Sequence, residues 1–188
     1  ARAWMAASDD PAVKRAETSV QVATLEEIAL DEPATALATW GQLQDPKVRA
    51  AAVMPLALAW AKRDPAAAVR WLEERGADGT DYLNSYQGTS VLTQWTKKDS
   101  DAALKWAEAR ATEDARMKAL EALGGELHQD RLSWAAKTEL YARVSDPALR
   151  ARALTWQLRN WSMNEPEAAK AWKAAHPALV PPDSGINP

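Results

Sequence analysis

The sequence predicts an all-α fold, a right-handed α-solenoid of about five antiparallel helix pairs with a repeat of 33–35 residues. Three observations predict it. Alanine, the strongest helix former, dominates the apolar residues. Alternating runs of β-branched and aromatic residues, which would indicate strands, are not evident. A motif bounded by tryptophans recurs along a chain of 188 residues that contains ten Trp and no Phe.

The recurring motif consists of Trp, three residues, an acidic residue, Pro or Ser, a run of small residues and a second Trp. Its three copies are residues 60–71, 95–106 and 161–172, which begin 35 and then 66 positions apart, one period and then two. A degenerate copy is expected around 113–144, with Leu127 in place of the first Trp, and another at 28–40.

Asp-Pro pairs predict where the helices begin. Asp accepts hydrogen bonds from unpaired N–H groups of the first turn, and Pro suits the first helical position because its missing N–H is not needed there. Because the residue before Pro disfavours the α region, the same pair ends the preceding helix. Such pairs are Asp45-Pro46, Asp64-Pro65 and Asp146-Pro147; Asp99-Ser100 has the same role without Pro, and in Asn164-Glu165-Pro166 either Asn164 or Glu165 is the expected cap.

These signals give the domain organisation. We expect a single helical-repeat domain over 1–176 and a Pro-rich tail over 177–188. The expected pairs are 11–43, 45–75, 80–111, 113–144 and 147–176, and the helices are expected near 11–30, 33–43, 46–62, 65–75, 80–97, 100–111, 113–127, 131–144, 147–163 and 166–175.

Six tryptophans at the ends of the motif copies are interpreted as the structural core of the repeat. Their regular spacing favours packing, and a carbohydrate-binding or aromatic cage is the alternative. The six are Trp60, Trp71, Trp95, Trp106, Trp161 and Trp172. Trp156 departs from the repeated positions, because its equivalent in an earlier copy is Pro55, and it is expected to be exposed.

One segment breaks the pattern. Asn84 stands where other copies carry Arg, and Tyr82, Tyr86 and Gln87 surround it. Tyr82 and Tyr86 are four residues apart and would share one face of a helix. Two interpretations stay open: local divergence with half-buried Tyr rings, or a polar and aromatic patch. With Trp156, these four residues are the candidate partner-binding residues.

The sequence gives little support to catalytic or metal chemistry. It has no Cys, which excludes disulfides and thiolate metal sites, and its two His, His128 and His176, are far apart. Gly124-Gly125 either ends the helix expected near 113–127 early or kinks it, and it lacks the Lys and the spacing of a phosphate-binding loop. We therefore expect no catalytic residue, cofactor or metal, and a protein that is not an enzyme.

Charge and hydropathy limit the classes of binding partner that we expect. The net charge is −3, from 23 basic and 26 acidic residues that are mixed along the chain, which disfavours nucleic-acid binding. No apolar run approaches 18 residues, so we expect no membrane-spanning helix. The oligomeric state stays open. The compartment also stays open between the bacterial periplasm and the cytoplasm, and the expectation slightly favours the periplasm.

The motif W-x3-[DE]-P-x-A-A-x3-W, preceded by an Arg-bearing helix, resembles the Ala- and Trp-rich helical repeats of bacterial proteins. It is similar in plan to tetratricopeptide and Sel1-like repeats, although the Gly-x2-Tyr element of the tetratricopeptide consensus is missing. This resemblance covers 28–176, implies an α-solenoid and supplies no catalytic residue. A weaker resemblance, to the superhelical N-terminal region of soluble lytic transglycosylases, implies a periplasmic role linked to peptidoglycan.

Stacked repeats expose a long surface that suits binding. We therefore expect a non-catalytic scaffold or adaptor that binds a protein or peptide through a solenoid surface. The alternatives are an accessory helical domain of a cell-wall-processing enzyme and a small-molecule binder that uses a groove between helices.

Overall fold

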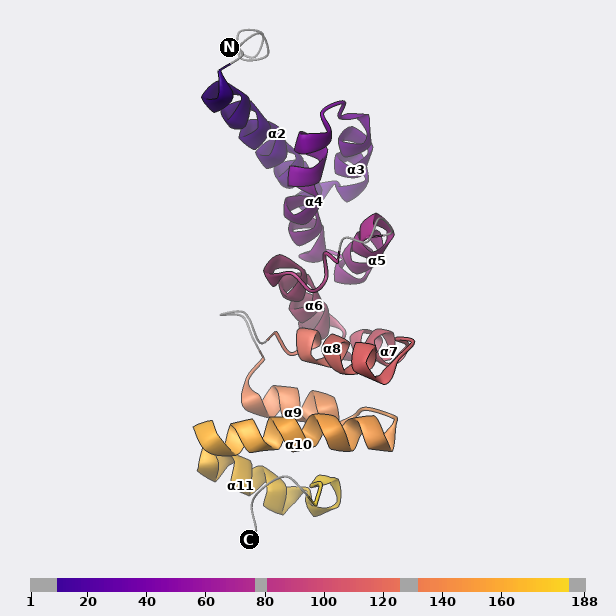
Figure 1. Cartoon of the computed structure of the whole chain (residues 1–188), viewed down its shortest axis with the longest axis vertical. Coiled ribbons are helices and arrows are strands. Elements are labelled where there is room, and N and C mark those ends of the chain that lie inside the picture. The colour runs from indigo at the N-terminus through magenta and orange to yellow at the C-terminus, as the bar shows by residue number, and fades with distance from the viewer. Residues whose placement is uncertain (1–9, 77–80, 126–131, 183–188) are drawn as a thin grey trace. The chain divides into compact units, whose positions relative to one another are not determined.

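The computed structural model describes residues 10–76, 81–125 and 132–182, and all regular elements within these ranges are helical (Figure 1). The predicted all-α class is confirmed. The described ranges contain one 3₁₀ turn, η2 (Pro177–Leu179), and ten α-helices: α2 (Pro11–Asp31), α3 (Pro33–Gln42), α4 (Pro46–Ala61), α5 (Pro65–Arg75), α6 (Tyr86–Lys98), α7 (Ser100–Glu108), α8 (Glu113–Leu123), α9 (Trp134–Ala142), α10 (Pro147–Asn164) and α11 (Pro166–Ala175).

The helices pack in sequential pairs. We call the first helix of each pair an A helix (α2, α4, α6, α8 and α10) and the second a B helix (α3, α5, α7, α9 and α11). Most contacts join elements that are neighbours in sequence, while the contacts of α2 with α4 and of α8 with α10 join A helices of successive pairs.

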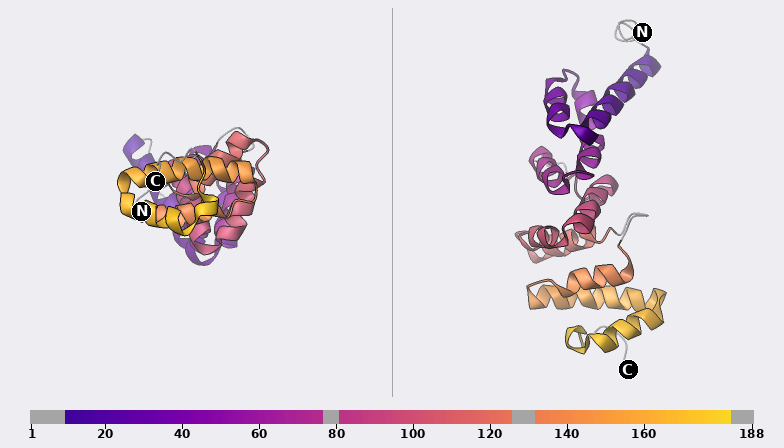
Figure 2. Two further views of the ribbon diagram at one scale, coloured as in Figure 1. Left: turned by 90° about the horizontal axis from the view of Figure 1, so that it is seen from below. Right: turned by 180° about the vertical axis from the view of Figure 1, so that it is seen from behind.

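The chain divides into two compact units inside α6, between Gln94 and Trp95. In the first unit, α4 packs against α2, α3 and α5. In the second unit, α10 packs against α8, α9 and α11, and Figure 2 shows α9 and α10 side by side from behind. The expected single repeat domain over 1–176 stays a prediction.

Asp-Pro pairs begin three of the A helices. Asp10, Asp45 and Asp146 each accept a hydrogen bond from the N–H two residues ahead, over 2.8 to 2.9 Å. Their backbones share an extended conformation, with ψ between 114° and 122°. Thr112 caps α8 through a bond of 3.1 Å from the N–H of Ala115. The predicted starts of α4 and α10 are confirmed.

A single acidic residue joins the A and B helices at four junctions. Its φ lies between −128° and −150° and its ψ between 69° and 83° at Glu32, Asp64, Asp99 and Glu165. Its N–H donates to the carbonyl four residues back over 2.7 to 2.9 Å, and its carbonyl accepts from the N–H four residues ahead over 3.0 to 3.1 Å. One residue therefore ends the A helix and begins the B helix.

The small-residue run of the motif places an alanine inside each of these junctions. The alanine four residues after the acidic residue is 0% exposed in all four: Ala36, Ala68, Ala103 and Ala169. Protein interiors are close-packed, so a larger side chain at this position would push the helices apart. The alanine therefore sets how closely the two helices approach.

The side chain of the acidic residue makes a cap hydrogen bond at some of these junctions and not at others. Asp64 and Asp99 cap their B helices by accepting from the N–H three residues ahead, over 2.9 and 3.0 Å. Glu165 takes the N-cap position of α11, but its carboxylate makes no cap bond, and the amide of Asn164 donates to the carbonyl of Asn160. Glu165, one of the two residues expected to cap α11, is therefore its N-cap residue, but the expected side-chain bond is not made.

The expected start of a helix near residue 80 is also wrong, because α6 begins at Tyr86. The Ser85 hydroxyl donates to the carbonyl of Tyr82 and accepts from the N–H of Gly88 over 3.0 Å, which makes Ser85 the cap. A Cβ on Gly88 would overlap the Tyr82 carbonyl oxygen, so only glycine lets the turn fold down onto the first turn of α6.

Three other boundaries differ from the expected ranges. Helix α7 ends at Glu108 and not near 111. Helix α8 ends at Leu123, so Gly124-Gly125 end it early, as one of the two alternatives predicted, and Gly125 takes a positive φ of 68° that favours glycine. Helix α9 begins at Trp134, after Ser133 accepts from the N–H of Ala136 over 3.2 Å. The predicted roles of Leu127 and His128 lie outside the described residues, as do residues 183–188 of the expected tail.

Candidate binding surface

Each of the six repeat tryptophans lies on one of the two helices of an A–B pair. Trp71, Trp95, Trp161 and Trp172 are buried, while Trp60 and Trp106 are half-buried. In two motif copies the two rings meet, with centroids 6.4 Å apart for Trp60 and Trp71 and 5.9 Å apart for Trp95 and Trp106. These rings therefore contact each other across the A and B helices of a pair.

The third copy is held differently. The indole N–H of Trp161 donates to Glu165 over 2.9 Å, and that of Trp172 donates to Glu139. A buried indole N–H needs an acceptor, and a carboxylate gives a strong one. In this copy, carboxylates accept the hydrogen bonds of both indole N–H groups.

A further repeated feature was missed in the sequence. Four residues after the second Trp of each copy stands Arg75, Arg110 or His176. The Arg110 guanidinium lies 4.5 Å from the ring centroid of Trp106, and the His176 ring stacks at 4.4 Å on Trp172. Arg75 instead lies over Trp40, 5.5 Å from its ring centroid. The spacing of four, about one helical turn, was the available signal for Arg110 and His176.

Trp156 lies on α10 and is 40% exposed, the only exposed Trp among the described residues. The Nζ of Lys137 on α9 is 5.1 Å from its ring centroid and 5.7 Å from that of Tyr141. Lys137 is itself buried, and its stem fills the space in which a Cβ on Gly124 would lie. The indole is thus supported from α9 by a cation.

The next residue fastens α10 to α9. Gln157 is buried, and its Nε2 donates to the carbonyl of Trp134 over 3.2 Å and to the hydroxyl of Thr138 over 3.4 Å. Its Oε1 is buried without a hydrogen-bond partner. The support beneath Trp156 is therefore a fixed contact between two helices.

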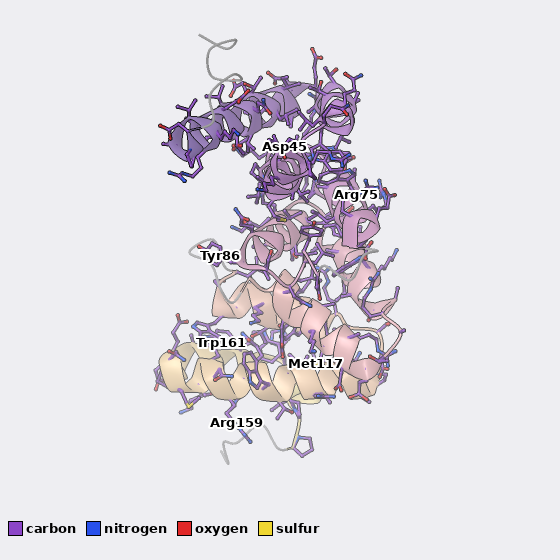
Figure 3. The ribbon with its side chains drawn as sticks, turned by 45° about the horizontal axis from the view of Figure 1, so that its top comes forward. Asp45, Arg75, Tyr86, Met117, Arg159 and Trp161 are labelled. Carbon is purple, nitrogen blue, oxygen red and sulfur yellow. The ribbon has the colours of Figure 1, made fainter. Side chains whose placement is uncertain are left out.

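Four residues of α10 form what we call the α10 face: Arg152, Trp156, Arg159 and Met163. Their spacings of four, three and four place them along one side of the helix. Met163 is 69% exposed, and Figure 3 shows that Arg159 and Trp161 leave α10 in opposite directions. The exposed side of α10 thus combines two large apolar side chains with two guanidinium groups.

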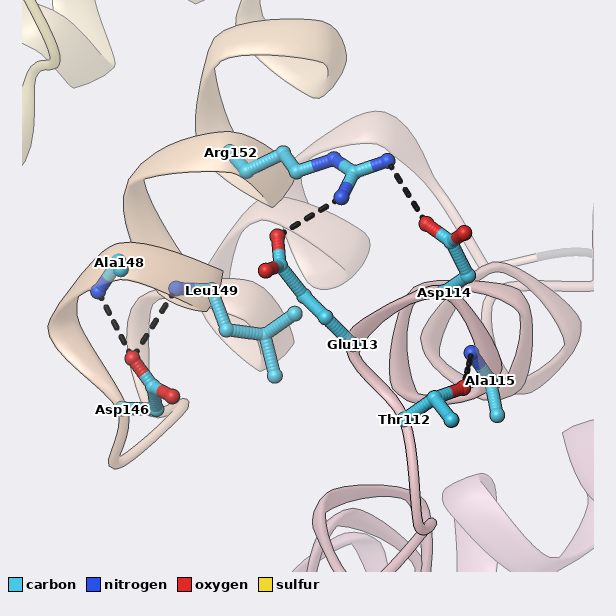
Figure 4. A network of polar contacts seen from close by, with 8 residues as sticks. All are labelled: Thr112, Glu113, Asp114, Ala115, Asp146, Ala148, Leu149 and Arg152. Atoms are coloured by element: carbon cyan, nitrogen blue, oxygen red, sulfur yellow. Dashed lines mark hydrogen bonds and ion pairs between the residues drawn. The ribbon is translucent and has the colours of Figure 1, made fainter.

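Arg152 links this face to α8. Its guanidinium bonds Glu113 over 2.7 Å and Asp114 over 3.4 Å (Figure 4). The hydrogen bond to Glu113 is the main reason that the pKa of Arg152 lies above its ordinary value. At the start of the same helix, the N–H groups of Leu149 and Ala148 lower the pKa of Asp146.

The second group of candidate residues lies at the start of α6, in the first unit. Tyr86 is 58% exposed and Gln87 is exposed, whereas Tyr82 is half-buried in the preceding turn. Asn84 is exposed, and its side chain donates to Asp81. The expected single helix face for Tyr82 and Tyr86 is wrong, because the helix begins only at Tyr86.

One residue of each group occupies the same exposed position of the repeat. Tyr86 and Arg152 both stand nine residues before the first Trp of their motif, as does Ala51, and all three are exposed. Trp156 stands five residues before that Trp. Tyr86 and Trp156 are therefore both exposed on A helices, although they stand at different positions of the repeat.

Comparison of the chain with family models, curated proteins and solved structures finds no match in any of the three. Function is therefore inferred from the geometry of the chain itself. In the described part of the chain, no three His, Cys, Asp or Glu side chains gather as metal ligands would. Within those same ranges, no helix has the length and apolar character needed to cross a membrane.

Proposed function

We propose that this protein is a non-catalytic scaffold or adaptor that binds a protein or peptide segment through the outward positions of its A helices. One observation carries the proposal. The tryptophans that make the repeat pack within the helix pairs, while the aromatic residues that break the repeat, Tyr86 and Trp156, are exposed on A helices.

The repeat itself supplies an internal comparison for Trp156. The equivalent position, five residues before the first Trp of the motif, holds Pro55 in one copy and Ser90 in another. A helix pair therefore forms without a large aromatic side chain there. An exposed Trp that packing does not require is a candidate for binding, since Trp, Tyr and Arg dominate the energetics of protein interfaces.

Support beneath an exposed ring favours binding. Association costs free energy when flexible side chains become ordered, so a ring already held by its neighbours loses less on binding. Trp156 lies against Lys137, and Gln157 beside it is hydrogen-bonded to α9. The indole is thus presented from a rigid element.

We also propose that the helix pairs stack as a right-handed α-solenoid, similar in plan to tetratricopeptide repeats. The support is that one conformation recurs at the junction between the A and B helices of a pair, at Glu32, Asp64, Asp99 and Glu165, so the pairs are similar units. Contacts between successive A helices, α2 with α4 and α8 with α10, are those expected of stacked units. Solution X-ray scattering tests it: a compact globule of 188 residues has a radius of gyration of about 16 Å, a solenoid has a larger one, and a value near the compact figure contradicts the stack.

The binding function is tested by selecting peptides from a displayed random library on the full chain. Tyr86→Ala and Trp156→Ala are then tested separately, and we expect at least one to weaken the selected peptides about thirtyfold, as truncation of an interface hot spot does. The controls are Lys105→Ala and Lys170→Ala, at exposed positions of the B helices α7 and α11. Loss of binding in the controls alone, or no selected peptide at all, contradicts the proposal.

A further inference from the structure

We infer that two copies of this chain pair through α2, with the same face of each helix in contact and the two helices antiparallel about a two-fold axis. This face, which we call the α2 face, consists of Val13, Ala16, Val20 and Ala23. Their spacings of three, four and three place them along one side of the helix. The inference goes beyond the proposed function and does not depend on it, since none of these residues belongs to the candidate binding surface.

The first half of α2 buries no side chain. The helix has 21 residues, but only Leu25 and Ala29 are buried, so residues 11–24 extend for about 21 Å without a buried residue. Figures 1 and 2 both show this part of α2 leading away from α3 and α4. It contains three Val, two Thr and one Ser, which form helices less readily than Ala, and isolated helices of this length are marginal in water. A further packing contact is therefore expected to stabilise it.

The repeat shows which kind of element covers the α2 face. With the acidic junction residues aligned, the positions of Ala16 and Val20 are only 0% to 4% exposed in two later A helices: Val48 and Ala52 of α4, and Leu149 and Ala153 of α10. In α2, Ala16 is exposed and Val20 is 49% exposed. Helices α4 and α10 each pack on the preceding A helix, whereas no A helix precedes α2 in the part of the chain that the structure describes. The α2 face is therefore the surface that this fold covers with another A helix.

A second copy of α2 is an A helix that fits this face. In an antiparallel pair whose centre lies near residue 18, Val20 of one copy lies opposite Ala16 of the other, and Val13 lies opposite Ala23. Each layer then joins one larger and one smaller side chain, which suits close packing between helices. Because the same surface serves both copies, the contact closes at two chains.

The last described helix pair does not offer an apolar surface for head-to-tail stacking. Val69 and Leu72 of α5 are 0% and 1% exposed, but their equivalents on α11 are Lys170, which is exposed, and Lys173, which is half-buried. If α2 of one copy stacked on α11 of another, the valines would lie against ammonium groups, and burying a charge costs free energy. Pairing of α2 with α2 is therefore favoured over a growing chain of copies.

Sedimentation equilibrium of the full chain over a range of concentrations tests the pairing. The α2 face is smaller than a standard protein interface, so we expect a monomer–dimer equilibrium with a Kd on the order of 10 μM to 1 mM. Val20→Glu should weaken association at least about tenfold, because it places a carboxylate in the contact. Glu forms helices more readily than Val, so this variant should keep the α-helical circular dichroism of the wild type. The matched control Ala38→Glu, at an exposed position of α3, should leave the Kd unchanged.

Disulfide trapping tests the orientation of the two helices, since the chain has no Cys of its own. Val13→Cys chains mixed with Ala23→Cys chains should cross-link to each other under mild oxidation. In the antiparallel pair, the two copies of residue 13 lie about 15 Å apart along the helix axis. That separation exceeds the Cα distance of about 7 Å that a disulfide spans, so Val13→Cys alone should cross-link far more slowly.

Four results would overturn the inference. A chain that stays monomeric at millimolar concentration does not pair, and an association that Val20→Glu leaves unchanged uses another surface. Faster cross-linking of Val13→Cys with itself than with Ala23→Cys would mean that the helices are parallel. A mass that grows past two chains as the concentration rises would show head-to-tail stacking instead.

Discussion

The α4–α5 and α10–α11 junctions share a sequence motif and a backbone conformation, yet different side-chain bonds hold them. At the first, the carboxylate of Asp64 caps α5 over 2.9 Å from the N–H of Ala67. At the second, Glu165 makes no cap bond and accepts from the indole N–H of Trp161 over 2.9 Å. The extra methylene of Glu carries its carboxylate past the cap position and back to the preceding helix.

The difference separates what the repeat requires from what each copy adds. Common to both junctions are the backbone conformation of the acidic residue, with φ near −140° and ψ of 83° or 70°, and the fully buried alanine four residues later, Ala68 or Ala169. The side-chain bond varies, so it serves the individual copy. The burial of the first Trp of the motif also varies between the copies, because Trp60 is half-buried and Trp161 is buried.

Removing these tryptophans should give the largest difference between the junctions. Trp161→Ala is expected to lower the free energy of unfolding by about 3–5 kcal/mol, since it empties a buried site. Trp60→Ala should cost less, because part of that ring is already in water. Urea unfolding of the full chain, followed by circular dichroism, measures both. An equal or larger cost at Trp60 would contradict this account.

Enlarging the buried alanines should have the same effect at both junctions. Ala68→Leu and Ala169→Leu are each expected to cost about 1–3 kcal/mol by overpacking. Ala174→Leu, at an exposed position of α11, is the matched control and should be nearly neutral. If either buried site tolerates Leu as well as the control does, close approach of the helices is not what the junction requires.

Exchanging the acidic residues should have unequal effects. Asp64→Glu removes an Asp cap and is expected to cost about 1 kcal/mol. Glu165→Asp loses the bond to Trp161 and gains the geometry of a cap, so its net effect should stay within about 0.5 kcal/mol. The same unfolding measurement compares them. Equal costs for the two exchanges would show that Asp and Glu have one role.

The smallest expected effect is a pH dependence at the start of α10. Hydrogen bonds from the N–H groups of Leu149 and then Ala148 lower the pKa of Asp146 below its ordinary 3.8. The stabilisation is therefore fully present above the unfolded-state pKa and is lost as the pH falls through the folded-state value.

Amide hydrogen exchange of the first turn of α10 measures this loss. Asp146→Asn keeps an N-cap acceptor but does not titrate, so acid should loosen the first turn less in this variant than in the wild type. Identical acid sensitivity in both proteins would assign the effect to other groups.

The sequence predicted the elements that local rules determine. Pro at the first helical position and Asp before it placed α4, α5 and α10 within one or two residues. The late start of α6 was not predictable in this way, because it depends on Gly88 packing against the Tyr82 carbonyl. Ser133 as the cap of α9 was missed because no Pro follows it.

The candidate surface was only partly predictable. Trp156 was identified because it departs from the repeat, and the spacing of Arg152, Arg159 and Met163 around it was present in the sequence. Which side of α10 faces solvent depends on its packing against α8, α9 and α11, which the motif alone does not reveal. The position of Lys137 behind the indole is a tertiary contact with no sequence signal.

Hydroxyl-radical footprinting of the full chain, with and without a selected peptide, tests the binding surface most directly. The account predicts that bound peptide slows oxidation of Trp156 and Met163 and leaves the half-buried Trp60 and Trp106 unchanged. Slower oxidation of Trp60 and Trp106, with Trp156 and Met163 unaffected, would mean that the repeated tryptophans bind the partner, and would contradict the account.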